Sequence, residues 1–144
     1  MATRVLLIED EPILISLYTL ALGRGGYDVL NAADLSSAEQ KVMNDHPHII
    51  LLDLLIPLTP SGDARQMDFH EPTGFRVLRL VKSSPQLADT RVIVLTNLDA
   101  DEHMKTADRL GADEYIIKAN LNPHDLAKRV AVILSRPPRA MQLG

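Results

Sequence analysis

The chain has 144 residues, a formal net charge of −4 and no cysteine. Its length fits one domain, and its 46% hydrophobic and 24% charged residues are ordinary for a globular protein. The lack of cysteine excludes disulfides and thiolate chemistry, and the acidic balance argues against nucleic acid as a direct partner. The apolar run near the N-terminus is too short for a signal peptide, and no apolar run in the chain reaches the length of a membrane span. We therefore expect a cytoplasmic protein without membrane contact.

Five short apolar runs of strand length are separated mostly by segments of helical spacing. The runs are 5–8, 29–30, 49–52, 92–95 and 115–117. The third and fourth runs are apolar at every position, which is typical of strands buried on both faces of a parallel sheet.

The segments between the runs carry helix signals. The first helix is expected to begin at Pro12 and to stop at the glycines of 23–26. Its apolar face is expected to hold Ile13, Leu14, Leu17 and Ala21. A capping box of Ser36 and Glu39 predicts a second helix that continues to about Asp45.

Three more helices are expected further along the chain. They cover 73–82, a segment ended by Gly111, and a segment capped by Asn122 with Pro123 at its first position. Their apolar positions are, in chain order, Phe75, Leu78 and Val81, then Met104, Ala107 and Leu110, then Leu126, Val130 and Ile133.

Alternation of strands and helices predicts an α/β fold, a (βα)₅ chain folded into one doubly wound parallel sheet with helices on both faces. In such sheets, ligands bind outside the C-terminal ends of the central strands. Residues 58–72 carry Pro60, Gly62 and Pro72 without periodicity and are interpreted as an inserted loop. The domain is expected to cover 1–135, and 136–144 is interpreted as a tail or a linker stub.

Polar side chains directly follow four of the expected strands. They are Glu9 and Asp10 after the first, Asp53 after the third, Thr96 at the end of the fourth and Lys118 after the fifth. Each alone is more often a helix cap or a solvated side chain, but the order of elements brings all of them to one edge of the sheet. Clustered carboxylates without histidine or cysteine favour Mg²⁺. A lysine and a hydroxyl beside an aspartate nucleophile suit phosphoryl transfer.

Four segments carry a family resemblance: Val5-Leu6-Leu7-Ile8-Glu9-Asp10-Glu11-Pro12, Leu51-Leu52-Asp53-Leu54-Leu55-Ile56-Pro57, Val94-Leu95-Thr96 and Gly111-Ala112-Asp113-Glu114-Tyr115-Ile116-Ile117-Lys118. Together they resemble the receiver domains of two-component response regulators, over about residues 4–134 and with an insertion after the third strand. The resemblance implies a flavodoxin-like sheet with strand order 2-1-3-4-5.

The resemblance also implies roles for individual residues. Asp53 would accept a phosphoryl group from a phosphohistidine of a sensor histidine kinase or a phosphotransfer protein, giving an aspartyl phosphate. Mg²⁺ would be held by Glu9, Asp10, Asp53 and the backbone carbonyl of Leu55. Such a chain is a signalling switch and not an enzyme, since it catalyses only its own Mg²⁺-dependent phosphorylation and dephosphorylation.

The switch implied by the resemblance involves three side chains. Lys118 would pair with the acyl phosphate, Thr96 would swing inward to the phosphoryl oxygen, and Tyr115 would follow from an outward to an inward rotamer. The change would alter the face built by the fourth helix, the fifth strand and the fifth helix, where a downstream partner or a homodimer would form. Whether the output is a separate protein or a missing output domain stays open.

Several positions depart from the family pattern. Glu9 replaces the usual aspartate, Asn97 stands where a small residue is preferred and would crowd or hydrogen-bond the phosphoryl site, and Ala119 replaces a proline. Because a cis bond before a non-proline residue is costly, a trans bond and a different aim for Lys118 are expected. About 13 residues are inserted within 58–72, either as a surface excursion or as a flap over Asp53.

Leu55 and Leu98 lie two residues beyond Asp53 and Thr96, where side chains can flank the path of a hydrolytic water. Neither side chain can orient water, so a long-lived phosphoryl state is predicted.

Two other functions compete with the phosphorylated switch. One is a pseudo-receiver, an interaction module that is never phosphorylated. The other is a Mg²⁺ phosphohydrolase, which would need an acid two residues after the nucleophile, where this chain has Leu55. A nucleotide-binding module is disfavoured because no glycine-rich loop follows the first strand.

Overall fold

The structure is a computed structural model, and it describes residues 2–60 and 71–142. The strands are β1 (Arg4–Ile8), β2 (Asp28–Ala32), β3 (Ile49–Leu52), β4 (Arg91–Thr96) and β5 (Glu114–Ile117). The helices are α1 (Pro12–Arg24), α2 (Leu35–Asp45), α3 (Phe75–Ser83), α4 (Asp101–Arg109) and α5 (Leu126–Leu134). Single 3₁₀ turns cover Pro85–Leu87, Lys118–Asn120 and Pro123–Asp125. Among the described residues, no helix combines the length and apolarity needed to cross a bilayer.

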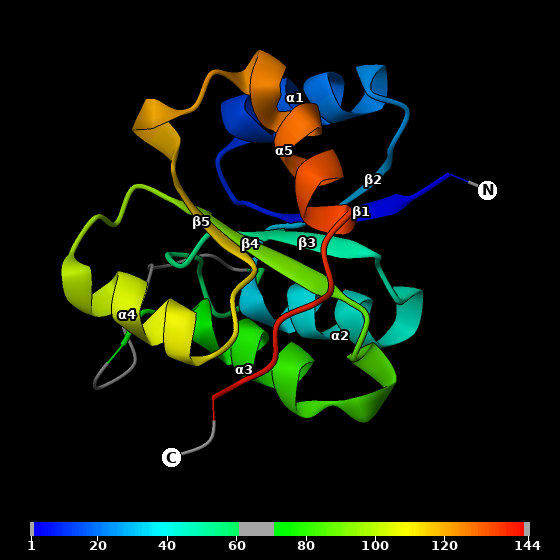
Figure 1. Cartoon of the computed structure of the whole chain (residues 1–144). Coiled ribbons are helices and arrows are strands. Elements are labelled where there is room, and N and C mark those ends of the chain that lie inside the picture. Colours follow the sequence, from blue (N-terminus) through cyan, green and yellow to red (C-terminus); the bar gives the residue numbers. More distant parts are fainter. Residues whose placement is uncertain (1, 61–70, 143–144) are drawn as a thin grey trace.

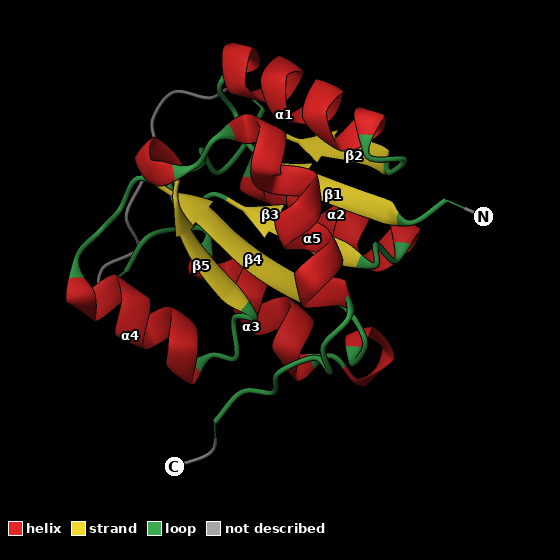
Figure 2. Cartoon of the chain, turned by 45° about the horizontal axis from the view of Figure 1, so that its top comes forward, coloured by secondary structure: helices red, strands yellow, loops and turns green. Residues whose placement is uncertain are grey.

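The five strands form one parallel sheet in the order β2-β1-β3-β4-β5. Helices α1 and α5 cover one face, and α2, α3 and α4 cover the other (Figures 1 and 2). The expected fold class and strand order are therefore confirmed.

Alternation along the strands divides the core into two layers. In β1, Leu6 and Ile8 face α2, α3 and α4, whereas Val5 and Leu7 face α1 and α5. All four residues of β3 are completely buried, as the uninterrupted apolar run predicts for a central strand.

The strand register brings the polar positions to one edge. Ile8 of β1 is paired with Leu52 of β3, so the residues that follow them, Glu9 and Asp53, leave the sheet at the same level. Thr96, the last residue of β4, is paired with Ile117, and Lys118 follows directly. Parallel strands in register thus place four polar side chains of distant sequence around one opening.

The expected apolar face of α1 was only partly right, since Leu14 packs against the core but Ile13 and Leu17 do not. Tyr18 and Leu22 are the buried residues of this helix, whereas Ile13 and Leu17 are 75% and 41% exposed. Helical spacing alone could not choose between two apolar stripes, because α1 is apolar around much of its circumference. Packing against α5 and β2 decides which stripe is inward.

The expected capping box of α2 was also wrong. The N-cap is Asp34, whose carboxylate accepts the N–H of Ser37 at 2.8 Å and its hydroxyl at 2.9 Å. An aspartate is as good a cap as a serine, so the cap lies two residues before the predicted one. By contrast, the inward residues expected for α3 and α5 are confirmed.

The segment after α5 is packed against the domain as far as residue 142. The backbone N–H of Arg139 donates to Asp113 at 2.8 Å, and its guanidinium donates to the carbonyl of Ala112 at 2.7 Å. Lys82 of α3 donates to the Arg139 carbonyl at 2.8 Å and forms a buried ion pair with Asp113 at 3.0 Å. These described tail residues therefore lie along the N-terminal ends of β4 and β5 and do not extend freely.

Candidate functional site

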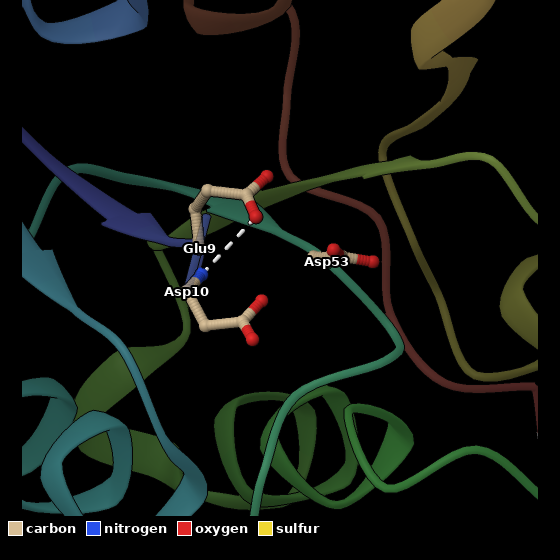
Figure 3. A group of neighbouring side chains, drawn as sticks. All are labelled: Glu9, Asp10 and Asp53. Atoms are coloured by element: carbon tan, nitrogen blue, oxygen red, sulfur yellow. Dashed lines mark hydrogen bonds between the residues drawn. The ribbon is translucent and has the colours of Figure 1, made fainter. Parts of the chain in front are cut away.

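Three carboxylates converge beyond the C-terminal ends of β1 and β3. One oxygen from each of Glu9, Asp10 and Asp53 lies within 4.8 Å of the others. Figure 3 shows Glu9 and Asp10 leaving the end of β1 while Asp53 approaches from the neighbouring strand. Glu9 and Asp53 are buried and Asp10 is partly buried, so the repulsion among them is only weakly screened by water.

Each oxygen of the Asp53 carboxylate has its own partners. Oδ1 accepts the hydroxyl of Thr96 at 2.9 Å and the N–H of Leu55 at 3.1 Å. Oδ2 accepts a hydrogen bond from Lys118 Nζ at 2.8 Å. The side chain is therefore held in one orientation by groups from β4 and from the turn after β5.

Lys118 contacts two of the three acids. Its Nζ lies 2.8 Å from Asp53 and 2.5 Å from Oε1 of Glu9, and its side chain is 8% exposed. Burial alone would lower the pKa of Lys118, but the charge of Asp53 and the hydrogen bonds to Asp53 and Glu9 outweigh it, so the pKa is raised. The lysine is thus held as an ammonium ion against the acid cluster.

Glu9 is the acid most affected by its surroundings. Burial raises its pKa, and the hydrogen bond and charge of Lys118 only partly oppose this effect. Its second oxygen accepts the backbone N–H groups of Asp10 at 3.1 Å and Glu11 at 3.2 Å. These bonds fix the carboxylate beside Asp10, as the dashed line in Figure 3 indicates.

The donor set fits a hard divalent cation. It consists of carboxylate oxygens from three residues, with no histidine or cysteine among them, which is the ligand type that Mg²⁺ prefers. One lysine cannot neutralise three carboxylates, so a dication would relieve the remaining repulsion. The carbonyl of Leu55 stays an expected ligand.

Tyr115 of β5 lies against the connection that follows β4. Its hydroxyl donates to the carbonyl of Leu98 at 2.7 Å, and the side chain is partly buried. Burial, with smaller contributions from Asp53 and Asp99, raises the pKa of Tyr115 to about 12. The two expected switch residues are therefore both hydrogen-bonded, Thr96 to Asp53 and Tyr115 to the backbone that follows β4.

Two departures from the family pattern meet in space. The side-chain carbonyl of Asn97 accepts the N–H of Ala119 at 2.9 Å. All peptide bonds of the described residues are trans, which confirms the expectation for the bond before Ala119. Sequence reasoning singled out both residues but did not pair them. The signal was present, since an alanine has the N–H that the usual proline lacks.

Gly74 directly precedes α3 and lies against the backbone that follows β3, a close approach that the expected helix over 73–82 did not indicate. A Cβ there would lie 2.6 Å from the carbonyl oxygen of Asp53 and 2.6 Å from the Cα of Leu54. Its N–H donates to the carbonyl of Leu54 at 2.8 Å. Only glycine lets the start of α3 approach the acidic loop this closely.

The structure brings together all the side chains expected at the site: Glu9, Asp10, Asp53, Thr96 and Lys118, with Tyr115 adjoining through Leu98. Most of the flap expected within 58–72 lies outside the described residues, which do not include 61–70. At its edges, the carbonyl of Leu58 accepts the N–H of Ser36 at 3.2 Å, and Glu71 pairs with Arg79.

Comparison with known proteins gives a consistent result. The sequence-family model of the response regulator receiver domain matches residues 5–131. The matched range includes every expected site residue.

Among curated relatives, a probable transcriptional regulator ycf27 of Porphyridium aerugineum is 30% identical over 137 residues, covering 95% of this chain and 50% of the relative. The phosphate regulon transcriptional regulatory protein PhoB of Klebsiella pneumoniae is 28% identical over 136 residues, covering 94% and 53%. The chain thus spans about half the length of these relatives.

Solved structures resemble the chain over nearly its whole length. The BeF₃-activated N-terminal receiver domain of Klebsiella pneumoniae RstA has a TM-score of 0.72 at 25% identity, covering 93% of this chain and 100% of the other. The chemotaxis response regulator CheY4 of Vibrio cholerae has a TM-score of 0.76 at 24% identity, covering 93% and 100%, and supports the fold alone.

Proposed function

The chain belongs to the response regulator receiver family, and from this premise we propose that it is a Mg²⁺-dependent phosphorylation switch whose phosphoacceptor is Asp53. Receiver domains are signalling switches of two-component systems and not conventional enzymes. They bind Mg²⁺ at an acidic pocket, and Glu9, Asp10 and Asp53 form such a group here. The contacts of Asp53 carry the proposal, because both of its oxygens are held and a cation site adjoins them.

The neighbouring residues have complementary roles in the proposed reaction. A bound Mg²⁺ would neutralise the acids and the incoming phosphoryl oxygens. Lys118, 2.8 Å from Asp53, is close enough to pair with an oxygen of the new acyl phosphate. Thr96, 2.9 Å from the other Asp53 oxygen, can donate its hydroxyl to a second oxygen. Such positioning and charge stabilisation account for most catalysis of phosphoryl transfer.

The donor is expected to be a phosphohistidine of a sensor kinase or phosphotransfer protein. Ile13, Leu17 and Leu20 are 75%, 41% and 54% exposed on α1, and their i, i+4, i+7 spacing forms one stripe. Since α1 begins directly after the acids of β1 (Figure 1), a protein that reaches Asp53 can cover this stripe. Leu17→Asp should slow transfer from the donor protein and leave modification by acetyl phosphate unchanged.

The proposed output is a change in the face formed by α4, β5 and α5, which Tyr115 borders. A downstream protein, a further domain or a second copy of the chain would read this change. The curated relatives include the DNA-binding dual master transcriptional regulator RpaA of Synechocystis, and we propose that any contact with DNA is made outside this domain. We place the protein in the cytoplasm on the basis of its family.

The test is phosphorylation by acetyl phosphate with Mg²⁺, followed by intact mass. We expect the mass of one phosphoryl group to be added, and we expect none in Asp53→Asn or without Mg²⁺. Asp28→Asn is a matched control, because Asp28 is exposed and begins β2 at the opposite end of the sheet. Beryllofluoride should shift the amide resonances of Thr96 and Tyr115. A folded protein with neither response would be a pseudo-receiver.

A further inference from the structure

The end of β4 and the connection from β4 to α4 are attached to the rest of the site at three consecutive residues, 96–98. The Thr96 hydroxyl contacts Asp53 at 2.9 Å. The Asn97 side chain accepts the N–H of Ala119 at 2.9 Å, and the Leu98 carbonyl accepts the Tyr115 hydroxyl at 2.7 Å. This stretch is therefore bonded to the residue that follows β3, to the turn after β5 and to β5 itself.

The middle attachment joins two positions that both depart from the family pattern. A proline at 119 would have no N–H to donate, and a small residue at 97 would have no side-chain acceptor. In this chain Ala119 supplies the donor and Asn97 supplies the acceptor. Neither departure alone would create the bond, so the two residues act as one unit, here called the Asn97–Ala119 clasp.

The clasp lies beside both groups that hold the phosphoacceptor. Asn97 directly follows Thr96, and Ala119 directly follows Lys118. The hydrogen bond therefore links the backbone segments that carry the hydroxyl on one Asp53 oxygen and the ammonium on the other. Motion of either segment away from Asp53 would have to break or stretch it.

Taking the proposed phosphorylation of Asp53 as its basis, we propose that Asn97 is a positioning residue that holds Thr96 and Lys118 on Asp53 before phosphoryl transfer. It does not touch the reacting atoms and acts through the N–H of Ala119. When the hydrogen bonds of Thr96 and Lys118 to Asp53 are already formed, these side chains need less reorganisation during phosphoryl transfer. The clasp also favours the hydrogen bond from Tyr115 to the carbonyl of Leu98, because Leu98 follows Asn97 in the same connection.

A double-mutant cycle tests the clasp. Asn97→Ala removes the acceptor, and Ala119→Pro removes the donor. Because one exposed hydrogen bond is lost, each single variant should slow modification by saturating acetyl phosphate by about two- to tenfold. The double variant should be no slower than Ala119→Pro alone. Asn120→Ala is the matched control, since Asn120 is an exposed asparagine in the same turn and should keep the wild-type rate.

A second readout does not depend on phosphorylation. In the metal-free, unmodified protein, Asn97→Ala should shift the amide resonances of Leu98 and Tyr115, and Asn120→Ala should not. Full additivity of the two substitutions, or unchanged Leu98 and Tyr115 resonances in Asn97→Ala, would overturn the proposal. If wild-type protein accepted no phosphoryl group while the resonances still shifted, phosphorylation of Asp53 would be the part that failed.

Discussion

Lys118 reaches past the proposed phosphoacceptor to Glu9, with 2.5 Å between its Nζ and Oε1 of the glutamate. The same ammonium lies 2.8 Å from Asp53, so one cation joins the acids that follow β1 and β3. The ammonium group of Lys118 thus neutralises part of the negative charge that a bound Mg²⁺ would also neutralise. The metal and the lysine would therefore interact with the same carboxylates, so removal of the lysine should change the affinity for the metal.

Replacing Lys118 with alanine should strengthen Mg²⁺ binding while reducing phosphorylation. The variant leaves three carboxylates without their ammonium partner, and their repulsion then favours a dication more strongly. The loss of one short charge interaction corresponds to about tenfold in affinity. Mg²⁺ titration followed by amide NMR measures this affinity, and Lys128→Ala, which changes an exposed residue of α5, is the control. Weaker Mg²⁺ binding in Lys118→Ala would show that the lysine organises the site more than it neutralises it.

On acidification, the Mg²⁺ affinity should begin to fall at a higher pH than it would if Glu9 had the pKa of an ordinary glutamate. Burial raises the pKa of Glu9 above its usual 4.5, so protons compete with the metal already above that pH. The Mg²⁺ affinity should therefore be highest well above the raised pKa of Glu9, and it should decrease as the pH falls through that pKa. In Glu9→Gln the affinity should be lower and less dependent on pH in this window. An unchanged pH profile in that variant would assign the competition to another group.

Replacing Leu55 with asparagine should shorten the lifetime of the aspartyl phosphate. Leu55 is partly buried two residues beyond Asp53, and its apolar side chain cannot orient an attacking water. An amide could hold that water by hydrogen bonds, and one such interaction is worth about tenfold in rate. Loss of the phosphoryl mass over time, after removal of acetyl phosphate, gives the rate. Leu55→Met keeps an apolar side chain of similar volume and should retain the slow rate.

The protein should lose stability between pH 10 and pH 12 because of Tyr115. Its pKa is raised from 10.0 to about 12 in the folded chain, so the folded state keeps a proton that the unfolded state releases. The associated stability is complete below pH 10 and is lost as the pH rises through the folded value. Urea unfolding across this range should show a steeper decline in wild type than in Tyr115→Phe. Equal declines would contradict burial of the hydroxyl.

Lys82→Met should destabilise the domain far more than a matched change on the same helix. Lys82 and Asp113 form an ion pair whose side chains are 4% and 3% exposed, and removal of one partner leaves a buried charge, at a cost of about 3 kcal/mol. Arg79 also belongs to α3, but its side chain is 43% exposed, so Arg79→Met should cost less than about 1 kcal/mol. Urea unfolding measures the loss of unfolding free energy in each variant. Similar losses in the two variants would mean that the N–H groups of Val92 and Arg139 are enough to stabilise the buried Asp113 carboxylate without Lys82.

The α/β class, the strand positions and the chemistry of the site could be predicted from the sequence. The apolar runs 49–52 and 92–95 identify central strands because a strand buried on both faces has no polar position. Asp53, Thr96 and Lys118 could be located because they directly follow such runs. Those inferences depend on residue type and spacing, which are local properties of the chain.

Three features depended on contacts between distant segments. Which stripe of α1 is buried, which residue caps α2 and where the tail packs each involve alternatives of similar local propensity. Packing against distant elements buries Tyr18 and Leu22 of α1. At the start of α2, the N–H groups of Leu35 and Ser36 donate to the carbonyls of Pro57 and Leu58, so the helix begins at Leu35 and Asp34 is its N-cap. Residues 112 and 113 anchor Arg139 through bonds that span at least 26 positions of sequence.

The sequence by itself determined which groups stand at the edge of the sheet, because each of them ends or directly follows an apolar strand run and the carboxyl ends of parallel strands meet at one edge. Only the tertiary structure decided how those groups pair: Lys118 with both Glu9 and Asp53, and Asn97 with Ala119. Hydrogen bonds and ion pairs of this kind depend on distances of a few ångströms between segments far apart in the chain. Spacing along the sequence does not contain those distances.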